Sequence, residues 1–300
     1  AITVVPFIEG PSEARREAML LAAGQQLKSR TNLSRAERQQ QTADWIRAQG
    51  WPEVDSVITS PTLSSINIKL KDGSSLLLIN KAKPDEADLD RDFPTGSALP
   101  QPIPENGWGS LAPSQSRARM TQKAGAALRG LPESRFAVCA FSLEADFANS
   151  GSTIGGWLDD KGYLTSYANG PTVDDVMRWF EPGPLGVLFW HAHGITYQDS
   201  DGQHYYSIAL SQKVKNQPGE KSYLVLRKKN EIGMAHSPED SNQAIYTLTH
   251  KFITNRMKFA PHSVVVVDAC DGANPLANEA FRHAGAGVFA SWDAESGKKS

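Results

Sequence analysis

The sequence predicts an α/β protein in which a small α+β module precedes a mainly parallel sheet flanked by helices. Two observations lead to this fold class. After residue 133, short apolar runs alternate with segments of helical periodicity, as in successive βα units. The apolar runs are nearly continuous, which is typical of parallel strands buried on both faces. With 300 residues, 40% of them hydrophobic, the chain can bury a core of this size.

Residues 1–80 are expected to form the α+β module. Two helices begin at the capping serines Ser12 and Ser34, and Glu37 completes a capping box at the second. Three strands follow, the last two joined by an Asp-Gly hairpin turn. The expected elements are helices over residues 13–28 and 35–49 and strands over residues 54–59, 66–70 and 76–79.

Residues 81–130 are expected to form a Pro-rich linker or an extended strap. Prolines and acidic residues dominate its first half, and basic residues follow between Arg117 and Arg129. Exposed linkers of this kind are where proteases cut, so the basic stretch is a candidate cleavage segment.

Residues 131–300 are expected to form the α/β domain. An excursion between residues 193 and 244 interrupts it, with hairpin-like runs at residues 204–210 and 222–226. The expected strands are 136–141, a short one near 164, 187–192, 263–269 and 288–291, and the expected helices are 153–158, 172–180, 244–257 and 275–283.

Two strand ends carry reactive side chains. One apolar run ends in His193 and Gly194 and another in Cys270, and ligands of open α/β sheets bind outside the carboxyl ends of strands. A nearby base or a helix N-terminus raises the thiolate fraction of a cysteine, and glycine leaves a backbone amide accessible to an oxyanion. Cys139 lies inside an apolar run without polar neighbours and is expected to be structural.

An apolar strand ending in His-Gly, followed by a later strand ending in Ala-Cys with a glycine beyond, resembles the caspase-like (clan CD) cysteine peptidases. The resemblance covers residues 136–300 and is closest in motif to clostripain-like and metacaspase-type enzymes. It implies a caspase-like sheet and a cysteine endopeptidase that acts through a Cys-His dyad and an acyl-enzyme. By position, Cys270 would be the nucleophile, His193 the general acid/base and Gly194 an oxyanion donor.

The resemblance also bears on specificity. Clostripain-like peptidases and metacaspases that cleave after Arg or Lys have an acidic residue two positions before the nucleophile, which here is Asp268. A carboxylate in the primary pocket would pair with a substrate cation, so cleavage after Arg or Lys is expected. The alternative is that Asp268 only caps a neighbouring loop. Asp146 and Trp292 follow two strands of the sheet and are further candidates for the substrate pocket.

Self-processing is a further expectation. The basic residues between Arg117 and Arg129, and those in the loop over residues 213–229, match cleavage after Arg or Lys. A zymogen could therefore free its cleft by autocatalytic cleavage in these loops.

Two alternative functions stay open. His191 and His193 lie two residues apart on one strand face, as some zinc hydrolases present two imidazoles, and Asp268 or His204 could complete the ligand set. A zinc-dependent hydrolase is therefore one alternative. A catalytically inactive caspase-like binding module is the other, and labelling of Cys270 by a thiol reagent distinguishes it from an enzyme.

Charge and composition exclude some partners. A net charge of -2 and a pI near 6.4 give no field that attracts nucleic acid, and no apolar run is long enough to span a membrane. The expected partner is a protein or peptide substrate. The residues indicate no cofactor, while activation by Ca²⁺ and the oligomeric state stay open. The chain begins at Ala1 rather than Met, which favours a secreted or periplasmic protein over a cytoplasmic one.

Overall fold

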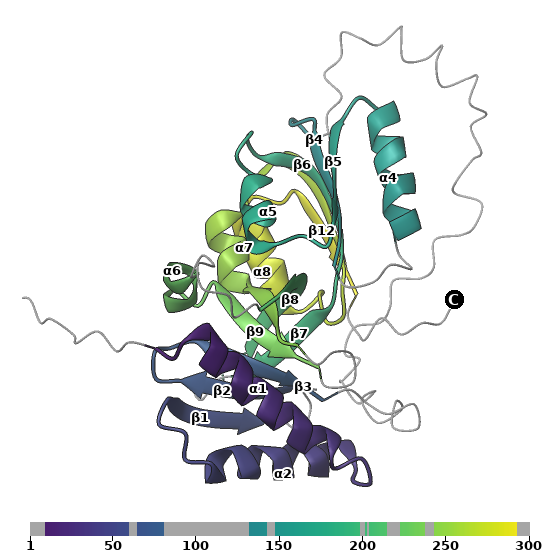
Figure 1. Cartoon of the computed structure of the whole chain (residues 1–300). Coiled ribbons are helices and arrows are strands. Elements are labelled where there is room, and N and C mark those ends of the chain that lie inside the picture. Colours follow the sequence, from purple (N-terminus) through teal and green to yellow (C-terminus); the bar gives the residue numbers. More distant parts are fainter. Residues whose placement is uncertain are drawn as a thin grey trace, which may run out of the picture.

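A computed structural model describes residues 10–59, 65–80, 132–142, 148–198, 202, 204–214, 223–237 and 243–292. Within these residues the chain is a mixed α/β protein built on two sheets (Figure 1). One sheet has five strands, all parallel, and is flanked by helices, whereas the other has seven strands. The predicted α/β class and the parallel sheet with flanking helices are thereby confirmed.

The parallel sheet contains the strands predicted after residue 133. Its order is β5-β4-β6-β11-β12, which in chain order is the doubly wound arrangement 2-1-3-4-5. This arrangement brings the carboxyl ends of all five strands to one edge, where ligand sites form. The strands are β4 (Phe136–Phe141), β5 (Leu164–Asn169), β6 (Leu185–His191), β11 (Phe259–Asp268) and β12 (Val288–Ser291).

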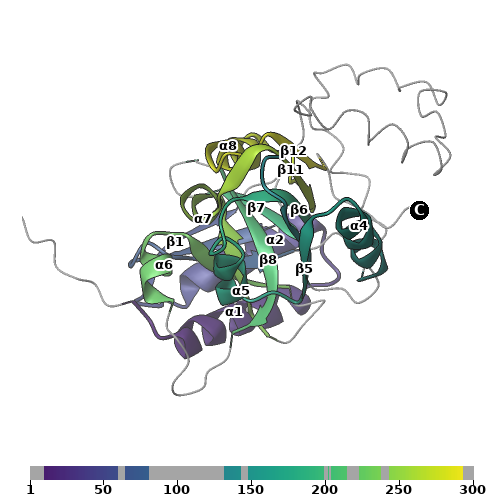
Figure 2. The same ribbon diagram turned by 90° about the horizontal axis from the view of Figure 1, so that it is seen from above.

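Helices lie on both faces of the parallel sheet. α4 packs along β4 and β5 on one face, and α5, α7 and α8 lie on the other (Figure 1 and Figure 2). Asn274 caps α8 by accepting a hydrogen bond from the Ala277 amide at 2.9 Å, and Pro275 occupies the first turn, where its missing N–H is tolerated. The helices are α4 (Ala148–Asp160), α5 (Val173–Arg178), α7 (His250–Arg256) and α8 (Pro275–His283).

The seven-stranded sheet joins the first eighty residues to the excursion. Its order is β1-β2-β3-β9-β10-β8-β7, with β3 and β9 parallel and the other neighbours antiparallel. The predicted N-terminal strands thus share one sheet with strands that follow His193. These strands are β1 (Val54–Thr59), β2 (Ser65–Leu70), β3 (Ser75–Ile79), β7 (Gly194–Gln198), β8 (His204–Lys213), β9 (Ile232–His236) and β10 (Ile245–Thr249).

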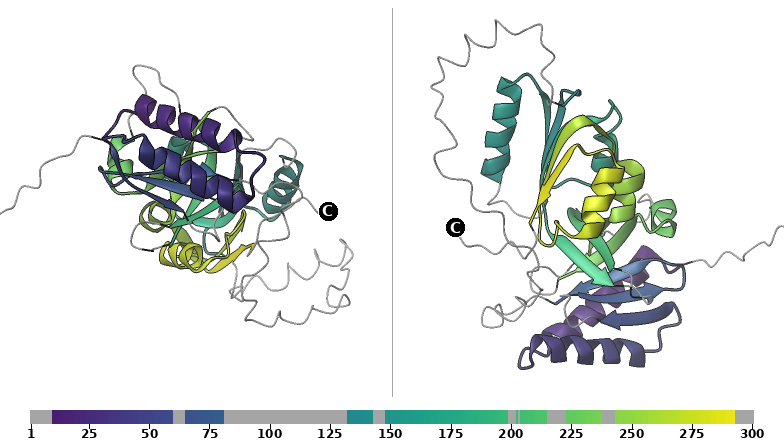
Figure 3. Two further views of the ribbon diagram at one scale, coloured as in Figure 1. Left: turned by 90° about the horizontal axis from the view of Figure 1, so that it is seen from below. Right: turned by 180° about the vertical axis from the view of Figure 1, so that it is seen from behind.

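The two N-terminal helices lie side by side against β1, β2 and β3 (Figure 3). They are α1 (Glu13–Lys28) and α2 (Arg35–Ala48). The predicted caps at Ser12 and Ser34 are confirmed, including the capping box with Glu37. Buried side chains of α1, of both sheets and of α7 and α8 belong to one core cluster, so the first eighty residues pack as part of the whole.

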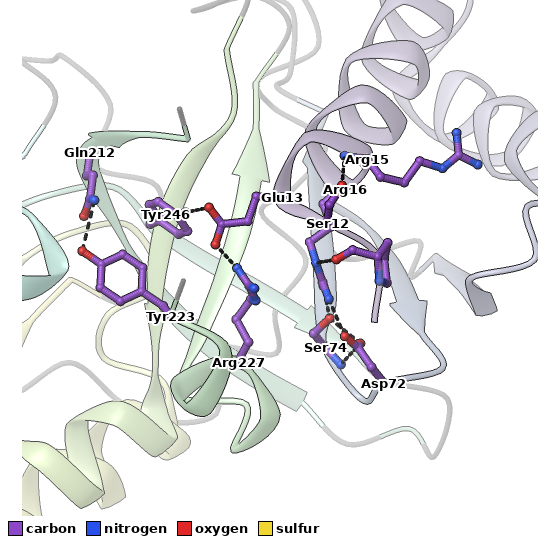
Figure 4. A network of polar contacts seen from close by, with 11 residues as sticks. Ser12, Glu13, Arg15, Arg16, Asp72, Ser74, Gln212, Tyr223, Arg227 and Tyr246 are labelled. Atoms are coloured by element: carbon purple, nitrogen blue, oxygen red, sulfur yellow. Dashed lines mark hydrogen bonds and ion pairs between the residues drawn. The ribbon is translucent and has the colours of Figure 1, made fainter. Parts of the chain in front are cut away.

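Ionic contacts connect α1 to the excursion (Figure 4). Glu13 forms an ion pair with Arg227 and accepts a hydrogen bond from the Tyr246 hydroxyl at 2.7 Å. Arg16 forms an ion pair with Asp72, and these two side chains are only 1% and 5% exposed. Buried charges tolerate few other arrangements, so these pairs fix α1 against the seven-stranded sheet.

Two elements predicted after His193 are wrong. The sequence predicts one helix over residues 244–257, but the structure has β10 followed by α7. Pairing of β10 with both β8 and β9 decides the strand conformation, which suits its alternating Tyr, Leu and Thr residues. The run at residues 222–226, predicted as a strand, instead enters the helix α6 (Leu224–Lys228).

The predicted linker over residues 81–130, with its basic cleavage segment, lies outside the described residues, as does part of the loop over residues 213–229. In the part of the chain that is described, no helix is both long and apolar enough to cross a membrane.

Candidate active site

The predicted reactive residues lie at the carboxyl ends of two neighbouring parallel strands, β6 and β11, or just beyond them. Burial alternates along β6 and the two residues after it, and along β11 from Ser263 through residue 270. Successive side chains of a strand point to opposite faces, so the partly exposed set lies on one face. This set comprises Val187, Phe189 and His191 of β6 and Val264, Val266 and Asp268 of β11, and His193 and Cys270 continue the alternation of burial beyond the strand ends.

His191 and Asp268 show how closely the two strands bring these side chains together. They are register partners, and His191 Nδ1 lies 2.7 Å from an Asp268 carboxylate oxygen. The Ala192 amide donates to the Asp268 carbonyl at 3.0 Å, so the chains still run side by side beyond the last paired residues. His193 and Cys270 each follow two residues later in the chain, just beyond the last residues of β6 and β11, and both are partly exposed.

Gly194 begins β7 directly against the backbone of Cys270. A Cβ atom at position 194 would lie 1.8 Å from the Cys270 carbonyl oxygen, so only glycine fits. The Ala209 amide donates to the His193 carbonyl at 2.8 Å, which makes the adjacent Gly194–Ile208 pair a non-hydrogen-bonded pair of the β7–β8 ladder. That ladder therefore does not use the Gly194 amide, as its predicted role in an oxyanion hole requires.

Hydrogen bonds connect the turn that carries Cys270 to β7 and to the residue after β12. Asp271 adopts a left-handed backbone conformation with φ 52°, and its carboxylate accepts a hydrogen bond from the Thr196 hydroxyl of β7 at 3.3 Å. On the other side, the Ala273 amide donates to the Trp292 carbonyl beyond β12 at 2.7 Å. These contacts fix the turn between β7 and β12.

The two cysteines lie in different environments. Cys139 is fully buried in β4, and burial together with the charge of Asp159 raises the pKa of its thiol to about 11. Cys270 is partly exposed. Cys139 is therefore protonated and shielded at neutral pH, and Cys270 is the more accessible of the two thiols.

The Asp268 carboxylate, predicted to recognise a substrate cation, has two partners of its own. Besides its contact with His191, it accepts a hydrogen bond from the indole N–H of Trp292. The hydrogen bond with His191 is the largest cause that lowers the pKa of Asp268, so the carboxyl group is ionised at neutral pH. The structure thus brings Asp268 and Trp292 together, whereas Asp146 lies outside the described residues.

The zinc alternative finds no ligand set in the described part of the chain. No group of three His, Cys, Asp or Glu side chains there could hold a metal ion. His204, considered as a further ligand, pairs with Gln198 at the opposite end of the β7–β8 ribbon from Gly194. His191 contacts Asp268 instead.

Two residues that border the site were not predicted. Thr196 contacts Asp271, and its cross-strand partner Tyr206 packs a ring carbon 3.2 Å from where a Cβ of Gly194 would lie. Thr196 follows Gly194 by two residues on one strand face, a signal visible in the sequence. Tyr206 reaches the site only through the register of β7 with β8.

In comparisons with known proteins, no family model, no curated protein and no solved structure matches this chain. The geometry of the site and the motif resemblance are therefore what bears on function.

Proposed function

We propose that this protein is a cysteine endopeptidase of the caspase-like type, with Cys270 as nucleophile and His193 as general acid/base. The observation that carries the proposal is the pairing of His191 with Asp268, since His193 and Cys270 each follow two residues later, just beyond the ends of these neighbouring strands. An accessible thiol beside a base is the arrangement that nucleophilic catalysis needs.

The reaction follows from these positions. His193 takes the proton of Cys270, and the thiolate adds to the carbonyl carbon of the scissile bond. The oxyanion accepts hydrogen bonds from the amides of Gly194 and Cys270. His193 then protonates the leaving amine as the C–N bond breaks, which leaves a thioester on Cys270. Water gives a proton to His193 and hydrolyses the thioester, and the thiol is restored.

The sheet is compatible with the caspase-like resemblance. The His-Gly and Ala-Cys motifs directly follow β6 and β11, the third and fourth strands of the doubly wound order, at the edge where such sheets bind ligands. The long separation of the two motifs is accounted for by the excursion, whose strands enter the second sheet. An insertion of this kind leaves the edge of the parallel sheet intact.

Cleavage after Arg or Lys is the specificity that Asp268 supports. Its ionised carboxylate lies two residues before Cys270, and its side chain is 28% exposed. His191 and Trp292 orient the carboxylate, and its remaining acceptor sites can receive a substrate cation. A neutral substrate side chain would leave these sites unpaired.

Hydrolysis of matched fluorogenic peptides ending in Arg, Lys, Asn or Asp tests the proposal on the full chain. The variants are Cys270→Ala and, as matched control, Cys139→Ala, which removes the buried thiol. We expect turnover of the Arg and Lys peptides by the wild type and by Cys139→Ala, none by Cys270→Ala, and no effect of a chelator.

Three results would contradict this proposal. Activity that survives in Cys270→Ala would reject the thiol nucleophile, and activity lost only to the chelator would favour a zinc hydrolase. No turnover, with Cys270 no more reactive than Cys139, would favour an inactive binding module. Self-processing is tested on the same samples, because wild type but not Cys270→Ala should shorten on incubation.

A further inference from the structure

Tyr206 lies beneath the turn that carries Cys270. It occupies the middle of β8, its side chain is 0% exposed, and its strand partner is Thr196. Its ring contacts Gly194, the residue whose Cα faces the Cys270 carbonyl oxygen. The face of the β7–β8 ribbon that bears Tyr206 therefore packs against the Cys270 turn.

The hydroxyl of Tyr206 is buried and has no hydrogen-bond partner among the described residues. Most buried polar groups are hydrogen-bonded, because an unpaired one loses its contacts with water without compensation. Burial, and after it the negative charges of Cys270 and Asp271, raises the pKa of Tyr206. The phenol is therefore neutral. A hydrogen bond from its hydroxyl to a nearby anion would stabilise the buried group.

The two groups near Tyr206 that can carry a negative charge are Asp271 and Cys270. They differ in whether they already accept a hydrogen bond. Asp271 already accepts a hydrogen bond from Thr196. Cys270 becomes an anion only when it has given its proton to His193. A donor that is unpaired with the thiol and paired with the thiolate stabilises the activated state selectively, which is how catalytic interactions contribute to rate.

We propose that Tyr206 is a positioning residue whose hydroxyl donates a hydrogen bond to the Cys270 thiolate and so lowers the pKa of that thiol. This inference rests on the proposed function. The groups that the inference considers around Cys270 are His193, which follows β6, Asp271 from its own turn and Tyr206 from β8, with the His191–Asp268 pair two residues before His193 and Cys270.

Tyr206→Phe tests the inference, because it removes the hydroxyl and keeps the ring. The rate at which iodoacetamide alkylates Cys270 is measured against pH by mass spectrometry of the full chain, with Cys139 as internal reference. The matched control is Tyr246→Phe in the neighbouring strand β10, where the hydroxyl does have a partner, Glu13. Thermal unfolding is recorded for each variant.

The two variants should have opposite signatures. In Tyr206→Phe the midpoint of the alkylation profile should rise by about one pH unit, with roughly tenfold slower alkylation below the midpoint, because a hydrogen bond to a charged group is lost. Its Tm should not fall, since the hydroxyl has no hydrogen-bond partner among the described residues of the folded protein. Tyr246→Phe should lower the Tm and leave the alkylation profile unchanged.

A wild-type alkylation profile in Tyr206→Phe, with peptide hydrolysis intact, would overturn the inference and leave the proposed function standing. A wild-type Cys270 that titrates like an ordinary free cysteine would instead overturn the proposed function. If Tyr206→Phe does not fold, 3-fluorotyrosine at position 206 supplies a stronger donor in the same shape. The inference then requires a lower midpoint, and an unchanged one refutes it.

Discussion

Gly194→Ala should abolish activity by displacing the backbone of the nucleophile. The added Cβ would lie 1.8 Å from the Cys270 carbonyl oxygen, whereas ordinary contact begins at 3.4 Å. The two segments must therefore separate by roughly 1.6 Å, and the Tyr206 ring at 3.2 Å restricts movement on the other side. Misplacement of a catalytic group by about 1 Å costs on the order of 100-fold in rate, so kcat/KM should fall at least that far.

The assay is kcat/KM on the Arg peptide together with alkylation of Cys270 and thermal unfolding. Gly156→Ala in α4 is the matched control, since its Cβ meets no described atom within 4 Å. A helical Gly→Ala change stabilises by about 0.5 to 1 kcal/mol, so this control should keep its activity and gain slightly in Tm. Wild-type kcat/KM in Gly194→Ala would refute the close approach of β7 to Cys270.

Two further predictions concern charged groups. Asp268→Asn should reduce kcat/KM on Arg and Lys peptides at least about tenfold while Cys270 stays alkylatable, because the substrate cation loses its partner. The folded protein lowers the pKa of Asp268 from 3.8, so this carboxylate contributes stability above that pH and loses the contribution as the pH falls through the folded pKa. The fall of Tm in acid should therefore be shallower in Asp268→Asn, and equal slopes would contradict the ionised pair with His191. Asp72→Ala should lower the free energy of unfolding by about 3 to 5 kcal/mol in urea, because it leaves the Arg16 charge buried without its partner. A loss below about 1 kcal/mol would show that Arg16 reaches solvent instead.

The sequence predicted best the features that depend on neighbouring residues. Ser12 and Ser34 cap helices through bonds to amides three residues away, and α8 begins and ends where Pro275 and His283 suggested. The strands 54–59 and 288–291 were also predicted with the observed bounds. Such signals act within one turn of helix or one strand, so the local sequence is sufficient to set them.

The errors came where a distant strand decided the conformation. Residues 245–249 have a composition that fits a helix or a strand, and pairing with β8 and β9 selects the strand. The joining of β3 to β9 could not be predicted either, because more than a hundred residues separate the two strands along the chain. The chain between them, which includes the strands β4 to β8, carries no local signal for that register.

In the candidate site, too, local features could be predicted and contacts between distant segments could not. His193, Gly194, Cys270 and Asp268 could be named from the sequence, because strand ends and glycine positions are local features. The contact of His191 with Asp268, the approach of Gly194 to the Cys270 carbonyl and the place of Tyr206 beneath the turn were decided by strand register alone. The sequence by itself determined which candidate reactive residues the chain carries and which helices and strands have local signals. The tertiary structure decided which side chains meet, because register in a sheet depends on packing between segments far apart in the chain.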